Sequence, residues 1–123
     1  MGNPHAVAFL DSSIDEINLH EIGPQIEHHP LFPNRVNFEV VNIIDRKHLR
    51  ARVWERGACI TMACGTGAAA VVAVAMHEGR IDPGSVALEM PGGTLGVTWS
   101  GANEELILRG PAVTAVSYTH LTL

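Results

Sequence analysis

The sequence predicts an α+β domain in which mostly antiparallel strands wrap, as a barrel-like sheet, around one central alanine-rich helix. Short runs of β-branched and aromatic residues recur between turns rich in Gly, Pro and Asn, a pattern typical of strands. Residues 66–78 form the one long helical segment, and they are apolar on nearly every side until the last two. Such a helix is expected to be buried all round. Its many alanines keep it thin, so that strands can pack close to it.

Several segments have the composition of strands. Residues 5–10 predict a short strand, and residues 36–44 predict a longer one because they are largely β-branched and aromatic. Residues 49–54 alternate apolar and polar side chains, which indicates a half-exposed strand. The last two segments are expected to pair as an antiparallel hairpin. Three further strands are expected at residues 86–90, 94–99 and 106–108.

Short helical turns are expected between the first two strands, where apolar residues within 14–26 recur three and four positions apart. Gly23 and Pro24 are expected to interrupt them, with Pro24 in the first turn of a second helix that stops near Pro30. Gly79 is expected to end the long helix, because glycine readily adopts the left-handed conformation found at helix C-termini.

Length and charge limit the classes of function. A chain of 123 residues is one domain by size; residues 1–116 are assigned to it, and residues 117–123 to a tail of doubtful origin because they fit the pattern poorly. The net charge of −5, without a run of Lys or Arg, argues against nucleic acid and anionic membranes as partners. No apolar run could span a bilayer and no secretory signal is present, so a cytoplasmic location is expected. The seven His and two Cys have no metal-ligand spacing, so no metal is expected.

A cysteine lies where the long helix should begin, within residues 63–67 (ACGTG). The first N–H groups of a helix lack internal partners and its dipole is positive there, so the pKa of a thiol in this position is lowered. The same N–H groups can bind a carboxylate or phosphate. This combination suits proton transfer beside a carboxylate. The alternative is a small buried packing residue in a tight entry turn.

Further segments point to a family when they are taken together. Residues 2–5, 23–27, 29–33, 35–38, 53–57, 63–67, 92–95 and 110–112, in this order and spacing, closely resemble the C-terminal half of diaminopimelate epimerase. The resemblance runs from Gly2 to about Val116. It implies two similar domains, each a strand-rich wrap around a central helix, with the substrate between them. It also implies inversion of one stereocentre of diaminopimelate without a cofactor: one thiolate removes the α-proton and a thiol on the opposite face returns one.

The resemblance assigns roles to individual residues. Cys64 matches one catalytic cysteine, Glu55 matches the group that contacts the substrate amine and tunes the thiols, and His5 matches a histidine near the reacting centre. Taken singly, the same residues also read as a packing cysteine, a solvated surface charge and an ordinary strand histidine. The other matched positions bind substrate: the amides of Gly65 and Thr66 hold the α-carboxylate, and Asn3, Asn37 and Arg56 grip the distal amino-acid end.

The chain departs from the family pattern in two ways that bear on activity. Cys59 and Ile60 stand where the family usually has Gly and then Glu, and glycine enters the left-handed region freely. The family's other catalytic cysteine belongs to an N-terminal half that this chain lacks. The expectation is therefore a truncated half-enzyme with little or no activity alone, whose partner is that missing half.

Two other functions fit the same residues. The first is a noncatalytic, self-associating ligand-binding module, in which a homodimer brings two Cys64 loops face to face. The second is a relative of proline racemase, which also uses two cysteines for proton transfer. The set formed by Asn3, Asn37 and Arg56 favours the longer diamino-dicarboxylic substrate.

Overall fold

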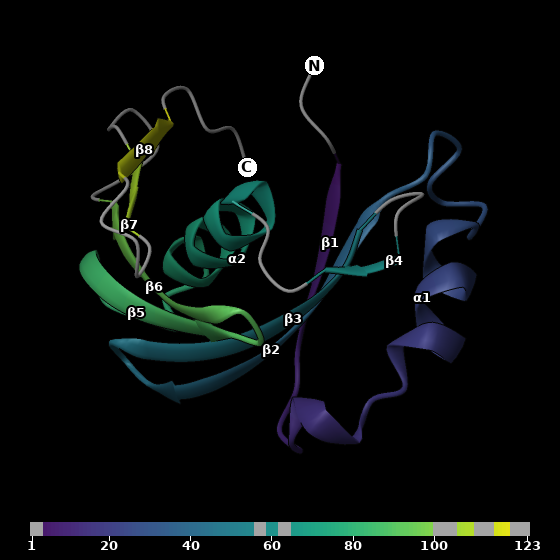
Figure 1. Cartoon of the computed structure of the whole chain (residues 1–123), viewed down its shortest axis with the longest axis horizontal. Helices are drawn as coiled ribbons and strands as arrows, with labels where there is room; N and C mark the ends of the chain where they lie inside the picture. Colours follow the sequence, from purple (N-terminus) through teal and green to yellow (C-terminus); the bar gives the residue numbers. More distant parts are fainter. Residues whose placement is uncertain (1–3, 56–58, 62–64, 100–105, 110–114, 119–123) are drawn as a thin grey trace.

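One curved sheet carries a helix on each face in the computed structural model, which describes residues 4–55, 59–61, 65–99, 106–109 and 115–118 (Figure 1). Within these residues the sheet has eight strands in the open order β1-β2-β3-β5-β6-β7-β8, and β4 pairs with β3. The elements along the chain are β1 (His5–Phe9), a 3₁₀ turn η1 (Ile14–Glu16), α1 (Leu19–Glu27), β2 (Asn37–Asp45), β3 (His48–Glu55), β4 (Cys59–Thr61), α2 (Gly65–His77), β5 (Gly84–Met90), β6 (Gly93–Trp99), β7 (Leu106–Arg109) and β8 (Ala115–Tyr118).

The α+β class and the mostly antiparallel pairing are confirmed. Strands β2 and β3 form the predicted antiparallel hairpin, with Phe38 opposite Trp54. Strands β5 to β8 are antiparallel from neighbour to neighbour, and β4 is antiparallel to β3. Two pairings, β1 with β2 and β3 with β5, are parallel. The strand order is open, so the sheet is not a closed barrel.

Strand β3 has two partners along one edge. Its first residues, His48 to Arg50, pair with β5, and its last three, Val53 to Glu55, pair with β4. Its other edge pairs with β2 along most of its length. The sheet therefore divides at β3 into two branches.

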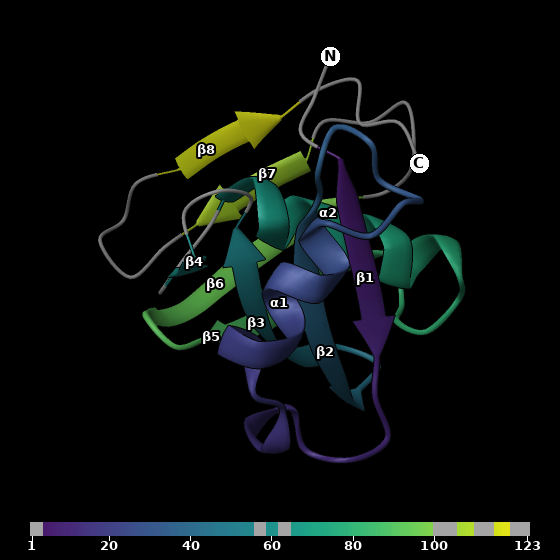
Figure 2. The same ribbon diagram turned by 90° about the vertical axis from the view of Figure 1, so that its right-hand side faces the viewer.

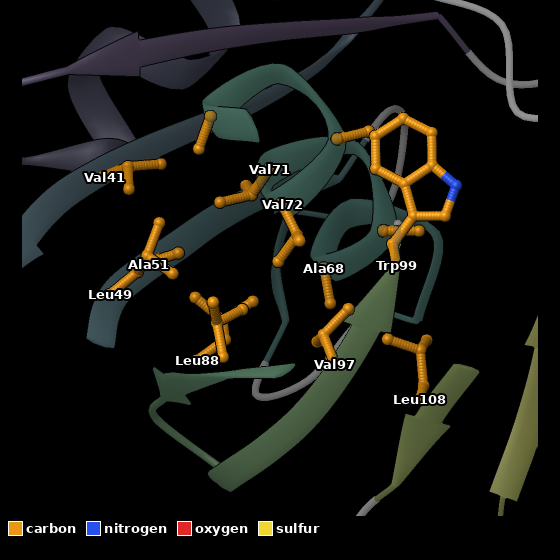
Figure 3. Packing of buried hydrophobic residues seen from close by; sticks show 14 of the residues in the cluster. Val41, Leu49, Ala51, Ala68, Val71, Val72, Leu88, Val97, Trp99 and Leu108 are labelled. Carbon is orange, nitrogen blue, oxygen red and sulfur yellow. The ribbon is translucent and has the colours of Figure 1, made fainter. Parts of the chain in front are cut away.

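Helix α2 packs against the concave face of the sheet, and Figure 1 shows the strands curving around it. Residues 67 to 73 of the helix are all buried, and except for Gly67 they are alanines and valines. It contacts β1, β2, β3, β6 and β7, and Figure 3 shows its valines meeting side chains from both branches of the sheet. Short side chains on the helix let larger ones on the strands fill the space, as interior packing at crystal-like density requires. The members of this cluster from the strands include Leu49, Leu88, Val97 and Trp99.

The predicted end of α2 at Gly79 is confirmed by its hydrogen bonds. Gly79 has a φ of 72°, which a residue with a side chain rarely adopts. Its N–H donates to the carbonyl of Met76 at 3.0 Å, and the N–H of Arg80 donates to the carbonyl of Ala75 at 2.9 Å. These two bonds form the Schellman arrangement that satisfies the last carbonyls of a helix.

The opposite face of the sheet is covered by α1 and η1 (Figure 2). Phe38, Val40 and Trp54 on the strands pack there against Ile14 and Leu19. The expectation of a half-exposed face on β3 is therefore wrong at Trp54, which is buried. The sequence pattern shows alternation, but it does not show that a helix covers the polar-looking side.

The predicted break at Gly23 and Pro24 is also wrong, because α1 is continuous through both residues. The chain breaks earlier, between η1 and α1, at Ile17 and Asn18. Gly23 lies so close to the ring of Trp54 that a side chain at this position would overlap it. Pro24 has no N–H, so the carbonyl of His20 loses its helical hydrogen bond; His20 is exposed. The free energy gained by packing the helix against the indole outweighs this cost.

Most of the strands expected from the sequence are found in the structure. The predicted strands at 5–10, 36–44, 86–90, 94–99 and 106–108 are confirmed as β1, β2, β5, β6 and β7, with ends shifted by one or two residues. Strand β4 was not predicted. Strand β8 crosses the proposed boundary of the tail, since Ser117 and Tyr118 pair with β7.

No helix within the described ranges combines the length and the apolar character that crossing a membrane requires.

The contact between Gly23 and Trp54 gives a test of the fold. Gly23→Ala is expected to lower the free energy of unfolding by about 1–3 kcal/mol, because the added methyl group overpacks a rigid ring. In an open helical position the same substitution raises it by about 0.5–1 kcal/mol. Urea unfolding followed by circular dichroism measures the difference. Gly96→Ala is the matched control, since its nearest contact would be an ordinary 3.9 Å. Equal stability of Gly23→Ala and the wild-type chain would contradict the packing.

Candidate active site

Three of the residues singled out in the sequence lie at one end of the sheet. His5 begins β1, Asn37 begins β2, and Glu55 ends β3. His5 is the register partner of Asn37, and Phe38 is the partner of Trp54, so the three residues lie on adjacent strands at the same end. Strand side chains alternate between the two faces.

These residues share the face that carries α2. The odd-numbered side chains of the three strands, such as Val7, Val41 and Val53, belong to the cluster around α2. By the same alternation His5, Asn37 and Glu55 lie on that face. Figure 2 shows β1, β2 and β3 side by side, with α2 behind them.

A short connection links this end of the sheet to the first residues of α2. Thr61 of β4 pairs with Val53 of β3, and α2 begins at Gly65. Four residues of chain span at most about 14 Å. The helix begins at Gly65, one residue before the expected start at residue 66, which places the amides of Gly65 and Thr66 at its positive end.

At this end of the sheet the side chain of His5 is hydrogen-bonded to Glu39, a residue that was not predicted from the sequence. The Nδ1 atom of His5 lies 3.0 Å from Oε1 and 3.1 Å from Oε2 of Glu39. The side chain of Glu39 is 0% exposed and that of His5 is 13% exposed. The available signal was an acidic residue between the apolar Phe38 and Val40 inside a strand, because an acid is rarely fully buried without a partner.

Burial raises the pKa of Glu39 from 4.5 to about 7, and the hydrogen bond and charge of His5 act in the opposite direction. An ionised carboxylate loses its hydration when it is covered by apolar side chains, so the neutral form is favoured. The carboxyl group of Glu39 can therefore gain or lose a proton near neutral pH. Perturbed carboxyl groups of this kind are frequent in active sites.

The other described residues of this end are set in the sheet. Asn37 is 1% exposed, and its backbone N–H donates to the carbonyl of Pro4 at 3.0 Å. Glu55 is half-buried. Cys59 and Ile60, the departures from the family pattern, lie in β4 opposite Glu55 and Trp54. An extended strand is open to any residue, so the backbone there does not require glycine.

Three expected site residues lie outside the described residues: Asn3, Arg56 and Cys64. Their roles stay predictions.

A cavity of about 310 Å³ lies at the other end of β1 and is not part of this site. Its polar groups serve the fold. Asn42 accepts from the N–H of Ile14 and donates to the carbonyls of Leu10 and Ser12. Arg80 pairs with Glu78 at 2.7 Å and stacks on the ring of Phe9.

Comparison with known proteins gives a consistent family. A family profile described as diaminopimelate epimerase matches residues 1–115, which ends one residue before the domain boundary expected at residue 116. A diaminopimelate epimerase of Stutzerimonas stutzeri is 50% identical over 113 residues, covering 92% of this chain and 40% of that protein. One of a Synechococcus species is 45% identical over 121 residues, covering 97% and 42%. The chain thus spans about 40% of the length of these curated relatives.

Among solved structures, a Bacillus anthracis phenazine biosynthesis protein of the PhzF family has a TM-score of 0.62 and 20% sequence identity. The match covers 89% of this chain and 35% of that protein. At this identity the likeness concerns the fold alone.

The buried carboxyl group predicts a pH dependence of stability. The pKa of Glu39 is higher in the folded chain than its ordinary value, so its contribution is fully present below about pH 4.5 and is lost as the pH rises through about 7. A shift of this size corresponds to roughly 3 kcal/mol. Glu39→Gln cannot ionise and is expected to remove this fall in the free energy of unfolding.

Urea unfolding at several pH values between 4.5 and 8 measures the effect. Glu21→Gln, at an exposed position on α1, is the control and should keep the wild-type slope. Identical pH slopes for Glu39→Gln and wild type would show that Glu39 is not the titrating group.

Proposed function

The chain belongs to the diaminopimelate epimerase family, and we propose that it forms the C-terminal half of a cofactor-independent isomerase that interconverts LL- and meso-diaminopimelate. The curved sheet packed on α2 supports the assignment of this chain to one strand-rich domain of such an enzyme. The N-terminal half supplies the second domain, and the substrate lies between the two. The proposed setting is lysine and cell-wall precursor biosynthesis in the cytoplasm.

The proposed reaction moves one proton off the α-carbon and another onto its opposite face. A thiolate takes the α-proton, so the C–H bond breaks and an S–H bond forms. The electron pair left on carbon spreads into the α-carboxylate. The S–H of a second cysteine then delivers its proton to the other face, which leaves that sulfur as the thiolate. Two groups are needed because a single base tends to return the proton to the face from which it came.

Cys64 is the proposed sulfur of this chain, and the head of α2 supports its role. Amides at Gly65 and Thr66 are aligned by the helix toward its positive end. Preorganised N–H donors stabilise negative charge that grows on a carboxylate, which lowers the barrier to removing a weakly acidic proton. The same end of a helix favours the thiolate. The second cysteine belongs to the N-terminal half.

The remaining proposed contacts recognise the amino acid. Glu55 binds the substrate ammonium and His5 lies near the reacting carbon. Asn3, Asn37 and Arg56 hold the distal end, where the planar fork of an arginine suits a carboxylate.

The observation that carries this proposal is the meeting of His5, Asn37 and Glu55 at one end of three adjacent strands. They are up to 50 positions apart in the sequence, yet the register places them on the face of the sheet that carries α2. A set of unrelated turn and surface residues has no reason to converge in this way.

Catalysis by Cys64 is testable in an assembled enzyme. The chain, joined to the N-terminal half of the Stutzerimonas stutzeri relative, is assayed for deuterium uptake from solvent at the substrate α-carbon. Cys64→Ala is expected to lower kcat by about 100-fold or more, the usual contribution of a positioned acid or base.

Cys59→Ala is the matched control for that experiment, because Cys59 precedes the same loop but has no proposed role in proton transfer. It is expected to keep kcat within about threefold, as surface or packing changes do when the reacting groups are untouched. Equal losses for the two variants would contradict the assignment of Cys64.

The isolated chain is expected to show no turnover, because one of the two proton carriers is absent. Incubation with LL-diaminopimelate in deuterated water, followed by NMR of the α-position, measures it. Sustained exchange by the isolated chain would overturn the half-enzyme proposal. Binding of diaminopimelate by a dimer without exchange would instead favour the noncatalytic module that pairs two Cys64 loops. Light scattering on the same sample identifies such a dimer.

A further inference from the structure

Glu39 is a buried acid to which the proposed reaction gives no role. It lies in the middle of the α2 face, between Asn37 and Val41 on its own strand. Its register partners on the neighbouring strands are Val7 and Val53, both apolar. A carboxyl group in such surroundings is costly unless it is paired.

Among the described residues, the imidazole of His5 is the group that bonds to this carboxyl, and it does so through a single ring nitrogen. Both carboxyl oxygens lie within hydrogen-bond distance of Nδ1, at 3.0 and 3.1 Å. An ionised carboxylate can only accept, so Nδ1 carries the proton in that state. The neutral ring then has its lone pair on Nε2.

In the part of the chain that the structure describes, few other charged groups face this pair. On β1 and β2 the titratable groups on the α2 face at this end are His5 and Glu39 themselves, and on β3 it is Glu55. Helix α2 has no charged residue between Gly67 and Met76. Within the described residues, Glu39 is thus the charged group that bonds to the ring of His5.

We propose that Glu39 is a positioning residue for His5: it accepts the Nδ1–H and so fixes the ring with Nε2 as its proton-accepting atom. The assignment to catalysis rests on the proposed epimerase function. In that setting Nε2 takes the proton of a site thiol, with the S–H bond breaking and an N–H bond forming, and returns it when the sulfur again needs to be a donor. A carboxylate that orients a histidine in this way also stabilises the imidazolium that forms.

The tautomer of His5 is directly measurable in the chain itself. Long-range ¹H–¹⁵N correlation spectra at pH 8, with labelled histidine, distinguish a protonated from an unprotonated ring nitrogen. The His5 signals are assigned by their loss in His5→Gln. In the wild-type chain Nδ1 is expected to be the protonated nitrogen.

Two substitutions at Glu39 then test the cause. Glu39→Met keeps the approximate volume and removes the acceptor, so the preference for Nδ1–H should be lost. Glu39→Gln both accepts and donates, and both tautomers should appear; this variant also serves if Glu39→Met fails to fold. Glu21→Gln should leave the His5 spectrum unchanged. An unchanged His5 tautomer in both Glu39 variants would overturn the inference, whatever the activity.

The assembled enzyme links this result to turnover. Glu39→Met is expected to lower kcat by about 10–100-fold with KM changed by less than about twofold, and Glu39→Gln should lie between it and wild type. Loss of substrate binding with unchanged kcat would instead mark a merely structural role and overturn the positioning of catalysis. If the assembled wild-type enzyme shows no turnover while the tautomer still depends on Glu39, the proposed function fails and the control of His5 by Glu39 stands.

Discussion

The burial of α2 against one face of the sheet is the interaction on which the rest of the structure depends. A helix that is apolar on every side cannot lie on a surface without exposing part of itself, so the strands must curve around it. Its alanines bring the strands close, and the bulk of the core comes from strand side chains such as Leu49, Leu88 and Trp99. The same packing sets which side chains of β1, β2 and β3 face the helix.

That constraint also places polar chemistry in an apolar setting. His5, Asn37, Glu39 and Glu55 occupy positions of the α2 face that continue the apolar stripe toward the end of the sheet. Their burial has an energetic cost that hydrogen bonds must offset. Their placement on paired strands makes the arrangement rigid, because side chains on paired strands move less than side chains on loops. The raised pKa of Glu39 is the clearest sign of this cost.

Much of this fold could be predicted from patterns that act over a few residues. The strand at residues 49–54, the apolar helix α2 and its stop at Gly79 each have a local physical cause, and the structure confirms these three elements. The predictions that failed all depend on tertiary contacts. The helix continues through Pro24 because Gly23 packs on Trp54, a contact between residues 31 positions apart that no local rule contains. The parallel pairings and β4 likewise depend on neighbours distant in sequence.

The candidate site, like the fold, could be predicted from the sequence only in part. A family resemblance pointed to His5, Asn37 and Glu55, and their convergence follows from strand register, which the sequence does not specify between β1 and β2. Glu39 was missed because its importance comes from burial and from one partner 34 positions away. An acid in a strand pattern is ordinary at an exposed position, and only the covering helix makes it unusual.

The division of the sheet at β3 has an evolutionary consequence. Strands β1 to β4 carry every described residue of the candidate site outside α2, whereas β5 to β8 serve as a wall behind the helix. Within the described residues, the ladder that joins the two branches is short, with three register pairs at the start of β3, and both branches pack on α2. Insertions at the turns of the wall should therefore be tolerated so long as its buried side chains still cover α2. Lineages of this domain are therefore expected to diverge more at the turns between β5 and β8 than at the buried positions of these strands.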